Sequence, residues 1–403
     1  MNSPTDQAAT CRHSGGPTIK VVVTGGGSGG HITPVLAVAA ALKAADPTIT
    51  IIYIGQKGDR LADIPAQDPN IDEVYTVRAG KFRRYHGLGI RQIFDLKTLF
   101  LNIRDLGYIA IGLIQSWRLM RRLRPQITFT RGGFVSVPVA LGGRLCGVPY
   151  ITHDSDSTPS LANRLIARWA RLHAVAFEVS TYPYIAAKTI KVGIPLSPDY
   201  RAVTPSLQSD YRRQIGVPTI GRMLFITGGG NGAHQLNQFV LEAAPLLLKR
   251  HPNLTIVHVA GRALETALSE SYNKILGTSE RQRVVVKGFL DNLYRYSGAA
   301  DVIIGRGGAT NMAEWAIQSK ACLIIPSPQL IWNVKNNQQL AKIGAVLQLT
   351  ELQAEQEGRL AKTISELLDS PEQRAELGKT LNTLARPNAA QDLADILIEQ
   401  AGK

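Results

Sequence analysis

The sequence predicts an α/β protein made of two Rossmann-like domains, whose parallel sheets face each other across a cleft. A glycine-rich segment at residues 24–31 returns almost letter for letter at residues 227–234. Each copy follows a short β-branched run and opens an apolar-periodic segment, which is the strand, turn and helix of a nucleotide-binding unit. The length of 403 residues suits two such domains better than one core.

The first half alternates between the two periodicities. Residues 19–23 predict a strand that precedes the first glycine turn, and residues 32–42 predict the helix after it. Thr158 and Pro159 predict an N-cap and first helical position for a helix over residues 160–172. The remaining elements expected in this half are strands over 49–55, 127–130 and 148–153 and a helix over 135–144.

The second half repeats the alternation after a proline-rich linker at residues 192–198. Its helix over 235–248 follows the second glycine turn, and Pro387 interrupts the pattern before a last amphipathic helix over 389–400. We expect strands at 223–226, 254–260, 284–286, 302–304 and 321–325. The domains expected are a flexible terminus at 1–17, an amino-terminal domain at 18–195, a carboxyl-terminal domain at 196–386 and a helix at 387–403 that packs back on the amino-terminal domain.

Cysteine usage and hydropathy predict a cytoplasmic protein. The three cysteines show no C-x-x-C spacing, so neither a disulfide framework nor a zinc site is indicated. The amino terminus lacks an apolar segment of signal-peptide length, and no apolar run reaches the ~20 residues that a membrane-spanning helix needs. We expect no cofactor and no bound metal, and we read the acidic pair Asp154 and Asp156 as part of a helix start.

The net charge of +14 is concentrated between Arg78 and Arg124, where eleven basic residues meet two acidic ones. Apolar side chains alternate with these bases, as on a surface that docks on anionic lipid. The alternative is a core helix with a solvated basic face. Nucleic acid is not expected as a partner, because no nucleic-acid-binding motif accompanies the charge. The residues predicted to contact a membrane are Lys81, Phe82, Arg83, Arg84, Leu88 and Arg91.

The glycine turns do not carry the signature of a dinucleotide site or of a Walker loop. The strand that follows each turn lacks the acidic residue that would bind a ribose, and no G-K-[ST] closes either turn. A third turn, at residues 305–308, is followed by a helix with Glu314 about one turn inside. Here a helix N-terminus can hold a diphosphate while a carboxylate accepts hydrogen bonds from a ribose diol. This layout indicates a sugar nucleotide, although Glu314 could instead only satisfy the helix N-terminus.

Taken together, these residues resemble the MurG-type lipid I N-acetylglucosaminyltransferases, which have the GT-B fold. The resemblance runs from about residue 19 to the last helix. It includes Gly-Gly-Ser-Gly-Gly-His at 26–31, Arg-Gly-Gly-Phe at 131–134, the second glycine turn with its Leu-Asn-Gln at 236–238, Phe-Leu-Asp at 289–291, and Arg-Gly-Gly-Ala at 306–309 with Glu314. It implies inverting, metal-independent transfer of N-acetylglucosamine from UDP-N-acetylglucosamine to the muramyl C4 hydroxyl of an undecaprenyl-diphosphate-linked acceptor.

The resemblance also implies residue roles and a place in the cell, at the cytoplasmic face of the membrane as a peripheral protein. His31 is the candidate general base, a role that imidazole chemistry allows, with a helix cap as its alternative role. His153 and His234 are weaker candidates. Leu290 is expected to contact uracil through its backbone. The other predicted binding residues are Ser28, Gly29 and Gly30 near the diphosphate; Ala309, Thr310, Asn311, Met312, Ala313 and Glu314 at the α-phosphate and ribose; and Trp332 and Asn333 at the donor sugar.

Four positions depart from the family pattern on the donor side. They are Asp156, Ser197, Gly230 and Asn333, where the family has asparagine, arginine, serine and glutamine. Gln338 or Gln339 could take the place of the missing glutamine. The departures leave the donor sugar undecided, and with it three alternatives: another UDP-sugar or glycolipid acceptor, a UDP-sugar 2-epimerase, or a non-catalytic subunit that binds a sugar nucleotide.

Overall fold

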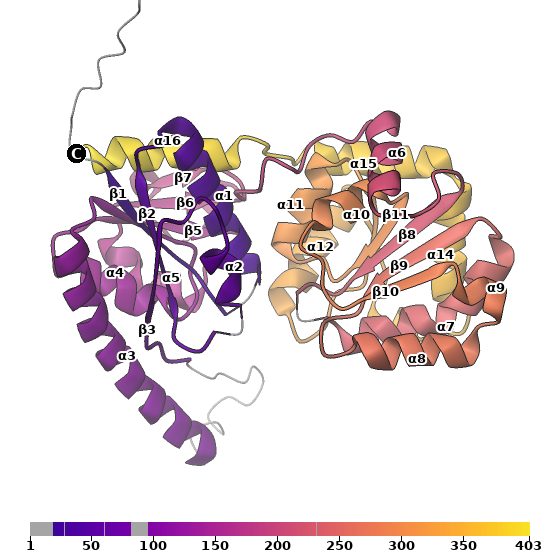
Figure 1. Ribbon diagram of the computed structural model, residues 1–403, viewed down its shortest axis with the longest axis horizontal. Helices are drawn as coiled ribbons and strands as arrows, with labels where there is room; N and C mark the ends of the chain where they lie inside the picture. The colour runs from indigo at the N-terminus through magenta and orange to yellow at the C-terminus, as the bar shows by residue number, and fades with distance from the viewer. Residues whose placement is uncertain (1–18, 28, 60, 82–95, 231) are drawn as a thin grey trace, which may run out of the picture.

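The structure is a computed structural model that describes residues 19–27, 29–59, 61–81, 96–230 and 232–403. It contains two sheets in which every pairing is parallel. The first sheet has seven strands in the order β3-β2-β1-β4-β5-β6-β7, and the second has six in the order β10-β9-β8-β11-β12-β13. The two sheets form two separate domains that stand side by side (Figure 1). The prediction of two Rossmann-like domains is therefore confirmed.

In the amino-terminal domain, β1 lies inside the sheet between β2 and β4, and its valines are buried on both faces. Thr24 at its end pairs in register with Thr130 at the end of β4, so the loops that follow both strands open at the same edge. The strands are β1 (Lys20–Thr24), β2 (Thr50–Gln56), β3 (Glu73–Val77), β4 (Ile127–Thr130), β5 (Tyr150–Asp154), β6 (Leu172–Val175) and β7 (Thr189–Lys191), and the helices are α1 (Gly29–Ala45), α2 (Asp63–Ala66), α3 (Leu96–Leu123), α4 (Ser136–Arg144) and α5 (Leu161–Ile166).

The carboxyl-terminal domain repeats this plan. β8 lies between β9 and β11, and Thr227 pairs with Gly305 at their carboxyl ends. The second and third glycine turns therefore open side by side. Its strands are β8 (Arg222–Thr227), β9 (Leu254–Val259), β10 (Val284–Lys287), β11 (Val302–Gly305), β12 (Ala321–Ile324) and β13 (Leu347–Gln348), and its helices are α6 (Pro205–Gln214), α7 (His234–Arg250), α8 (Glu265–Ile275), α9 (Thr278–Arg281), α10 (Leu293–Ala299), α11 (Ala309–Ile317), α12 (Ile331–Lys342), α13 (Glu351–Ala354), α14 (Arg359–Asp369) and α15 (Pro371–Asn382).

The chain crosses between the domains twice. It first passes through residues 192–204 and returns after α15, and the last helix, α16 (Ala389–Ala401), lies on the amino-terminal domain (Figure 1). Leu393 and Leu397 of α16 are fully buried in one core with Val38 and Leu42 of α1. The two crossings and this apolar contact connect the domains on one side of the molecule.

Two glycines allow the backbone of residues 78–81 to pack directly against the long helix α3. A Cβ on Gly80 would lie 2.0 Å from the backbone oxygen of Asp105, and a Cβ on Gly112 would lie 1.9 Å from that of Arg78. Residues 78–81 can therefore rest directly on α3 only because both positions lack a side chain. The first turns of α3 extend away from the sheet (Figure 1).

The predicted helix over residues 160–172 is wrong in its start and its length. Ser160, not Thr158, is the N-cap, and its side chain accepts a hydrogen bond from the backbone N–H of Asn163. The α-helix ends at Ile166, a 3-10 turn follows, and Leu172 already belongs to β6. Pairing of β6 with β5 overrides the helical periodicity of the sequence there.

Candidate functional site

A cavity of about 300 Å³ lies between the two domains and is the candidate donor site. We call it the donor cavity. Its walls come from the loops at the carboxyl ends of both sheets, which is where parallel α/β sheets bind their ligands. Its lining includes Gly29, Gly30 and Thr33 of α1, Ser197 and Tyr200 of the crossing segment, Gly229 and Gly230 of the second glycine turn, Leu290, and Thr310, Asn311 and Glu314 of α11.

The starts of two helices meet at the donor cavity. A Cβ on Gly30, in the first turn of α1, would lie 3.6 Å from Oγ1 of Thr310, in the first turn of α11. The first N–H groups of a helix have no partner within the helix, and the helix dipole makes this end positive. Two such ends at one cavity favour an anion with more than one negative group, such as a diphosphate.

Glu314 is the buried carboxylate of this cavity. It is 5% exposed, and Nδ2 of Asn311 donates to its Oε2 at 2.9 Å. The hydroxyl of Tyr200 donates to it as well. Burial raises the pKa of Glu314 to about 7, although both hydrogen bonds act in the opposite direction. A carboxylate offers about four acceptor positions, so Glu314 retains acceptor capacity for further donors.

The lining of the donor cavity also contains the predicted uracil position. Leu290 and Phe289 line the donor cavity in the loop after β10. The guanidinium of Arg262 stacks on Phe289, 4.3 Å from the centre of its ring. Ser197 and Gly230, two of the four departures from the family pattern, also line the cavity, and Oγ of Ser197 donates to Asp199 at 2.9 Å.

His31 faces a different cavity of about 360 Å³, although it belongs to the same first turns of α1. Its Nδ1 lies 3.2 Å from the backbone oxygen of Gly26. This contact requires the proton on Nδ1, which makes Nε2 the acceptor of the ring. Burial, and then the charge of Arg131, lower the pKa of His31 to about 4. The imidazole is therefore neutral at pH 7 and can accept a proton.

The first glycine turn holds a carboxylate of its own chain. The backbone N–H of Gly27 donates to Oδ2 of Asp59 at 2.7 Å, and a Cβ on Gly26 would lie 2.9 Å from the same oxygen. Asp59 follows β2, so the carboxyl end of the neighbouring strand supplies this anion. The contact demonstrates that the turn accepts a negative oxygen.

The two acidic residues at and just after the end of β5, Asp154 and Asp156, differ in their surroundings. Asp154 accepts hydrogen bonds from the backbone of Ser160, from Asn163 and from Tyr184, and it thereby holds the loop before α5. Within the described part of the chain, Asp156 has no side-chain hydrogen bond of this kind, and its strongest charge contact is with the buried Arg131. Neither residue lines the donor cavity.

The loop that contains Asp156 reaches the second domain. Oγ of Ser157 donates to Oδ1 of Asn336 at 2.7 Å, which joins this loop to α12. The carbonyl oxygen of Asn333 accepts from Asn337 within the same helix, and Asn333 does not line the donor cavity. Gln338 and Gln339 are exposed on α12. None of these three places its side chain among the donor-cavity residues that the structure describes.

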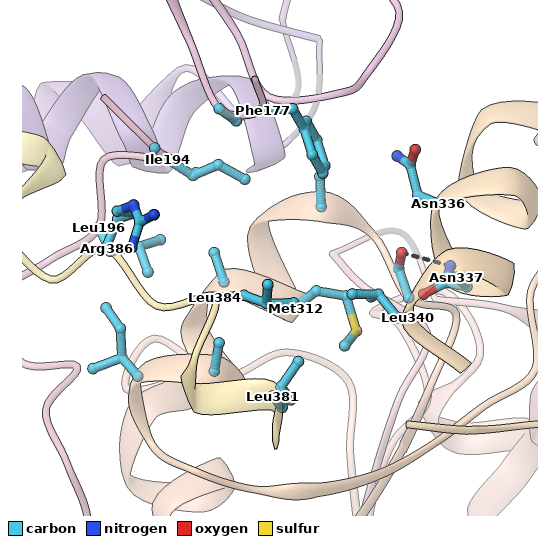
Figure 2. Close-up of a pocket in the computed structure, with 17 residues that line it drawn as sticks. Phe177, Ile194, Leu196, Met312, Asn336, Asn337, Leu340, Leu381, Leu384 and Arg386 are labelled. Atoms are coloured by element: carbon cyan, nitrogen blue, oxygen red, sulfur yellow. Dashed lines mark hydrogen bonds between the residues drawn. The ribbon is translucent and has the colours of Figure 1, made fainter. Parts of the chain in front are cut away.

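The predicted binding residues of α11 divide between two cavities. Thr310, Asn311 and Glu314 face the donor cavity. Ala309, Met312 and Ala313 instead line an apolar cavity of about 110 Å³ between the domains, with Phe177, Ile194 and Leu340 around it (Figure 2). Adjacent residues of a helix point in different directions, so a continuous sequence motif cannot all face one ligand.

Several predicted residues lie outside the described residues: Ser28, Phe82, Arg83, Arg84, Leu88 and Arg91, together with the side chain of Trp332. His153 is fully buried with its Nε2 2.7 Å from the backbone oxygen of Gly193, and His234 is exposed at the start of α7. Sequence reasoning missed Tyr200 and Asp59. The one signal for Tyr200 was its position two residues after the proline-rich linker at residues 192–198.

Comparisons with known proteins agree with this architecture. Residues 21–175 match the glycosyltransferase family 28 N-terminal domain, and residues 223–393 match the glycosyltransferase family 28 C-terminal domain. The crystal structure of Acinetobacter baumannii MurG is 22% identical, with a TM-score of 0.67 over 94% of this chain and 99% of that chain. This likeness confirms the predicted GT-B fold.

Two curated relatives have the name UDP-N-acetylglucosamine–N-acetylmuramyl-(pentapeptide) pyrophosphoryl-undecaprenol N-acetylglucosamine transferase. The one from Moorella thermoacetica is 29% identical over 94% of this chain and 99% of its own length. The one from Bacillus anthracis, which is numbered 2, is 34% identical over 76% of this chain and 79% of its own length. The resemblance seen in the sequence is thereby confirmed, and the chain belongs to glycosyltransferase family 28, in the group of the MurG-type N-acetylglucosaminyltransferases.

Proposed function

We propose that this protein transfers N-acetylglucosamine from UDP-N-acetylglucosamine to the C4 hydroxyl of a muramyl-peptide that is linked to undecaprenyl diphosphate. The observation that supports this best is the donor cavity, where the starts of α1 and α11 converge beside the buried Glu314. The names of the relatives in Moorella thermoacetica and Bacillus anthracis supply the two substrates.

The roles of the residues follow from the chemistry of the transfer. Glu314 accepts hydrogen bonds from the ribose hydroxyls, and the helix starts hold the diphosphate. The bond between the sugar C1 and the diphosphate oxygen breaks, and the same helix ends stabilise the negative charge that develops on UDP. The acceptor hydroxyl forms the new bond to C1 from the opposite face, and Nε2 of His31 takes its proton.

His31 and the diphosphate site lie at the same helix start, which supports this division of work. Gly29 and Gly30 line the donor cavity, whereas His31, one residue later, lines the neighbouring cavity. An acceptor in the second cavity therefore meets a donor in the first at the N-terminus of α1.

We also propose that the protein docks on the cytoplasmic face of the membrane through α3. Among the described residues, none of the helices combines the length and the hydropathy needed to cross a bilayer. α3 nevertheless exposes a stripe of large apolar side chains on its outward side, with basic residues at its carboxyl end, as expected for a helix that lies in an anionic lipid surface. The stripe, which we call the α3 stripe, consists of Phe100, Ile103, Leu106, Ile111 and Ile114.

The donor sugar is the part of the proposal that depends on the four departures. Ser197 and Gly230 replace larger polar side chains at the wall of the donor cavity, which leaves fewer donors for a sugar there. We retain N-acetylglucosamine because the relatives share it by name and because Asn311, Thr310 and Glu314 remain together.

The deciding experiment measures UDP release by the purified full chain. UDP-N-acetylglucosamine, UDP-glucose and UDP-N-acetylgalactosamine are compared, each with and without a muramyl-pentapeptide diphosphate acceptor. We expect acceptor-dependent release from UDP-N-acetylglucosamine and a disaccharide product. Acceptor-independent conversion of the donor to its C2 epimer would indicate an isomerase instead, and UDP binding without any turnover would indicate a non-catalytic subunit.

A further inference from the structure

The cavity beside His31 has a polar end and an apolar wall. Gly26, Gly27 and His31 form the polar end, at the first glycine turn. The rest of the lining is mostly carbon and comes from three helices and the loop before one of them. We call these side chains the apolar wall: Ile109 of α3, Phe134 and Val137 at the start of α4, and Leu161, Ala162 and Leu165 of α5.

The apolar wall does not match the chemistry of the acceptor's sugar, peptide or diphosphate, because those groups need hydrogen-bond donors and acceptors. It is also not fully covered, since Leu165 is 49% exposed and four of its neighbours in the wall are half-buried. Apolar surface gathered around a cavity of about 360 Å³ is typical of a binding site for an apolar group.

The side chain of Lys81 places a positive charge where the polar end of the cavity meets the apolar wall. Nζ of Lys81 lies 5.6 Å from the centre of the Phe134 ring, and Lys81 lines the same cavity. The segment that carries it is fixed, because the backbone N–H of Lys81 donates to Oδ2 of Asp105 and Gly80 lies directly against the backbone of α3. A positive charge at this boundary suits an anionic group that is joined directly to an apolar one.

The apolar wall and the α3 stripe share one helix. Ile109 of the wall belongs to α3, and Leu106 of the stripe, 58% exposed, lies one turn earlier on the same helix. Residues three apart in a helix are neighbours on its surface. An apolar chain that leaves a membrane at Leu106 therefore needs to pass only one turn of α3 to reach Ile109 of the wall.

We propose that the apolar wall binds the first isoprenoid carbons of the acceptor, those next to the diphosphate, and that Lys81 binds the diphosphate itself. This inference rests on the proposed function, which supplies a prenyl-diphosphate acceptor. A cavity of this size holds only a short segment of the prenyl chain, so the rest of the prenyl chain stays in the membrane. Recognition of the acceptor thus includes its lipid, and the wall sets how far the muramyl sugar extends towards His31.

The test uses two water-soluble acceptors that share the muramyl-pentapeptide diphosphate head, one with a ten-carbon prenyl group and one with a methyl group. Initial rates are measured without membranes, so the α3 stripe does not contribute. For the parent protein we expect KM to be at least tenfold lower for the prenyl acceptor. Leu165→Gln should raise the KM of the prenyl acceptor about fivefold to tenfold and leave kcat and the methyl acceptor unchanged, whereas Lys81→Met should raise KM for both.

The matched control is Leu145→Gln. Leu145 is 65% exposed in the same domain but does not line the cavity beside His31, so this variant should leave the KM of both acceptors unchanged. Leu161→Asn gives a second test of the wall if Leu165→Gln does not fold. An equal rise for both acceptors in the wall variants would overturn the proposal, and so would equal KM values in the parent. Absence of transfer to either acceptor would instead overturn the proposed function, and this inference with it.

Discussion

Asn311 and Glu314 are joined by a hydrogen bond of 2.9 Å, from Nδ2 to Oε2, within the first turns of α11. Tyr200 reaches the same carboxylate from the segment that crosses between the domains. Both donors are neutral, so they hold the carboxylate in place without supplying a positive charge. Burial therefore dominates, and Glu314 has a pKa of about 7 in the absence of ligand. The charge of this residue is easily shifted by a ligand that brings further donors.

Glu314→Ala should weaken UDP binding by about 2–4 kcal/mol, because two charge-assisted hydrogen bonds to the ribose are lost. Titration calorimetry with UDP measures the change, and the circular dichroism spectrum of the variant verifies its fold. Unchanged affinity in a folded variant would show that Glu314 does not contact the nucleotide.

UDP binding should strengthen as the pH rises from about 5.5 to 8. The ionised carboxylate accepts ribose hydrogen bonds better than the protonated one, and Glu314 with a pKa of about 7 must lose its proton to bind. Below pH 7 the affinity should fall by up to tenfold for each pH unit. Glu314→Gln removes this titration and should flatten that part of the profile. An identical slope in the variant would assign the pH dependence to another group, such as the UDP phosphates.

Glu314 should make the unliganded protein less stable at alkaline pH than at acidic pH. Its pKa lies above the ordinary 4.5, so the fold favours the protonated form. The protonated Glu314 therefore contributes its full stabilisation of the fold below about pH 4.5, and this contribution is lost as the pH rises through 7. At pH 8, Glu314→Gln should therefore raise the free energy of unfolding by about 1–3 kcal/mol. Urea titrations at pH 8 and pH 5 compare the two proteins, and an equal difference at both values would contradict the shift.

His31→Ala should lower kcat about 100-fold and leave the UDP dissociation constant within twofold of the parent value. At saturating donor, the parent's kcat should fall only when the pH drops to about 4, because burial and Arg131 bring the pKa of His31 to about 4. Steady-state rates and calorimetry together separate the two effects. Loss of binding in parallel with turnover would make His31 a structural cap of α1.

Replacement of Phe100, Ile103 and Leu106 by serine should reduce sedimentation with anionic vesicles and slow transfer to a long-chain acceptor in those vesicles. The three side chains are 68%, 62% and 58% exposed, so the fold should tolerate the change. Serine at Ile185, Ile220 and Leu352, which lie elsewhere and are 67%, 85% and 76% exposed, serves as the control. Equal vesicle binding by both triple variants would show that α3 is ordinary solvated surface.

Local sequence patterns predicted many of the elements in their order, although they missed the strands β3, β7 and β13. β-branched runs, glycine turns and helical periodicity are local signals, and they predicted β1, β8, β11 and the helices that follow them. The local signal failed for residues 160–172, where a strand pairing decides the outcome. The position of Glu314 about one turn into a helix after a glycine turn was also readable, because the spacing along one helix is fixed.

How these elements divide the site depends on their packing in three dimensions, which no local pattern predicted. The first turns of α1 separate two cavities, so that Gly30 faces Thr310 while His31 faces the apolar wall. The packing of separate elements also brings Tyr200 to Glu314 and Asp59 to the first glycine turn. Asp154 meanwhile accepts a hydrogen bond from the loop before α5. The reason is physical: a sequence fixes spacing within an element, whereas the direction of a side chain and its partner depend on how separate elements pack.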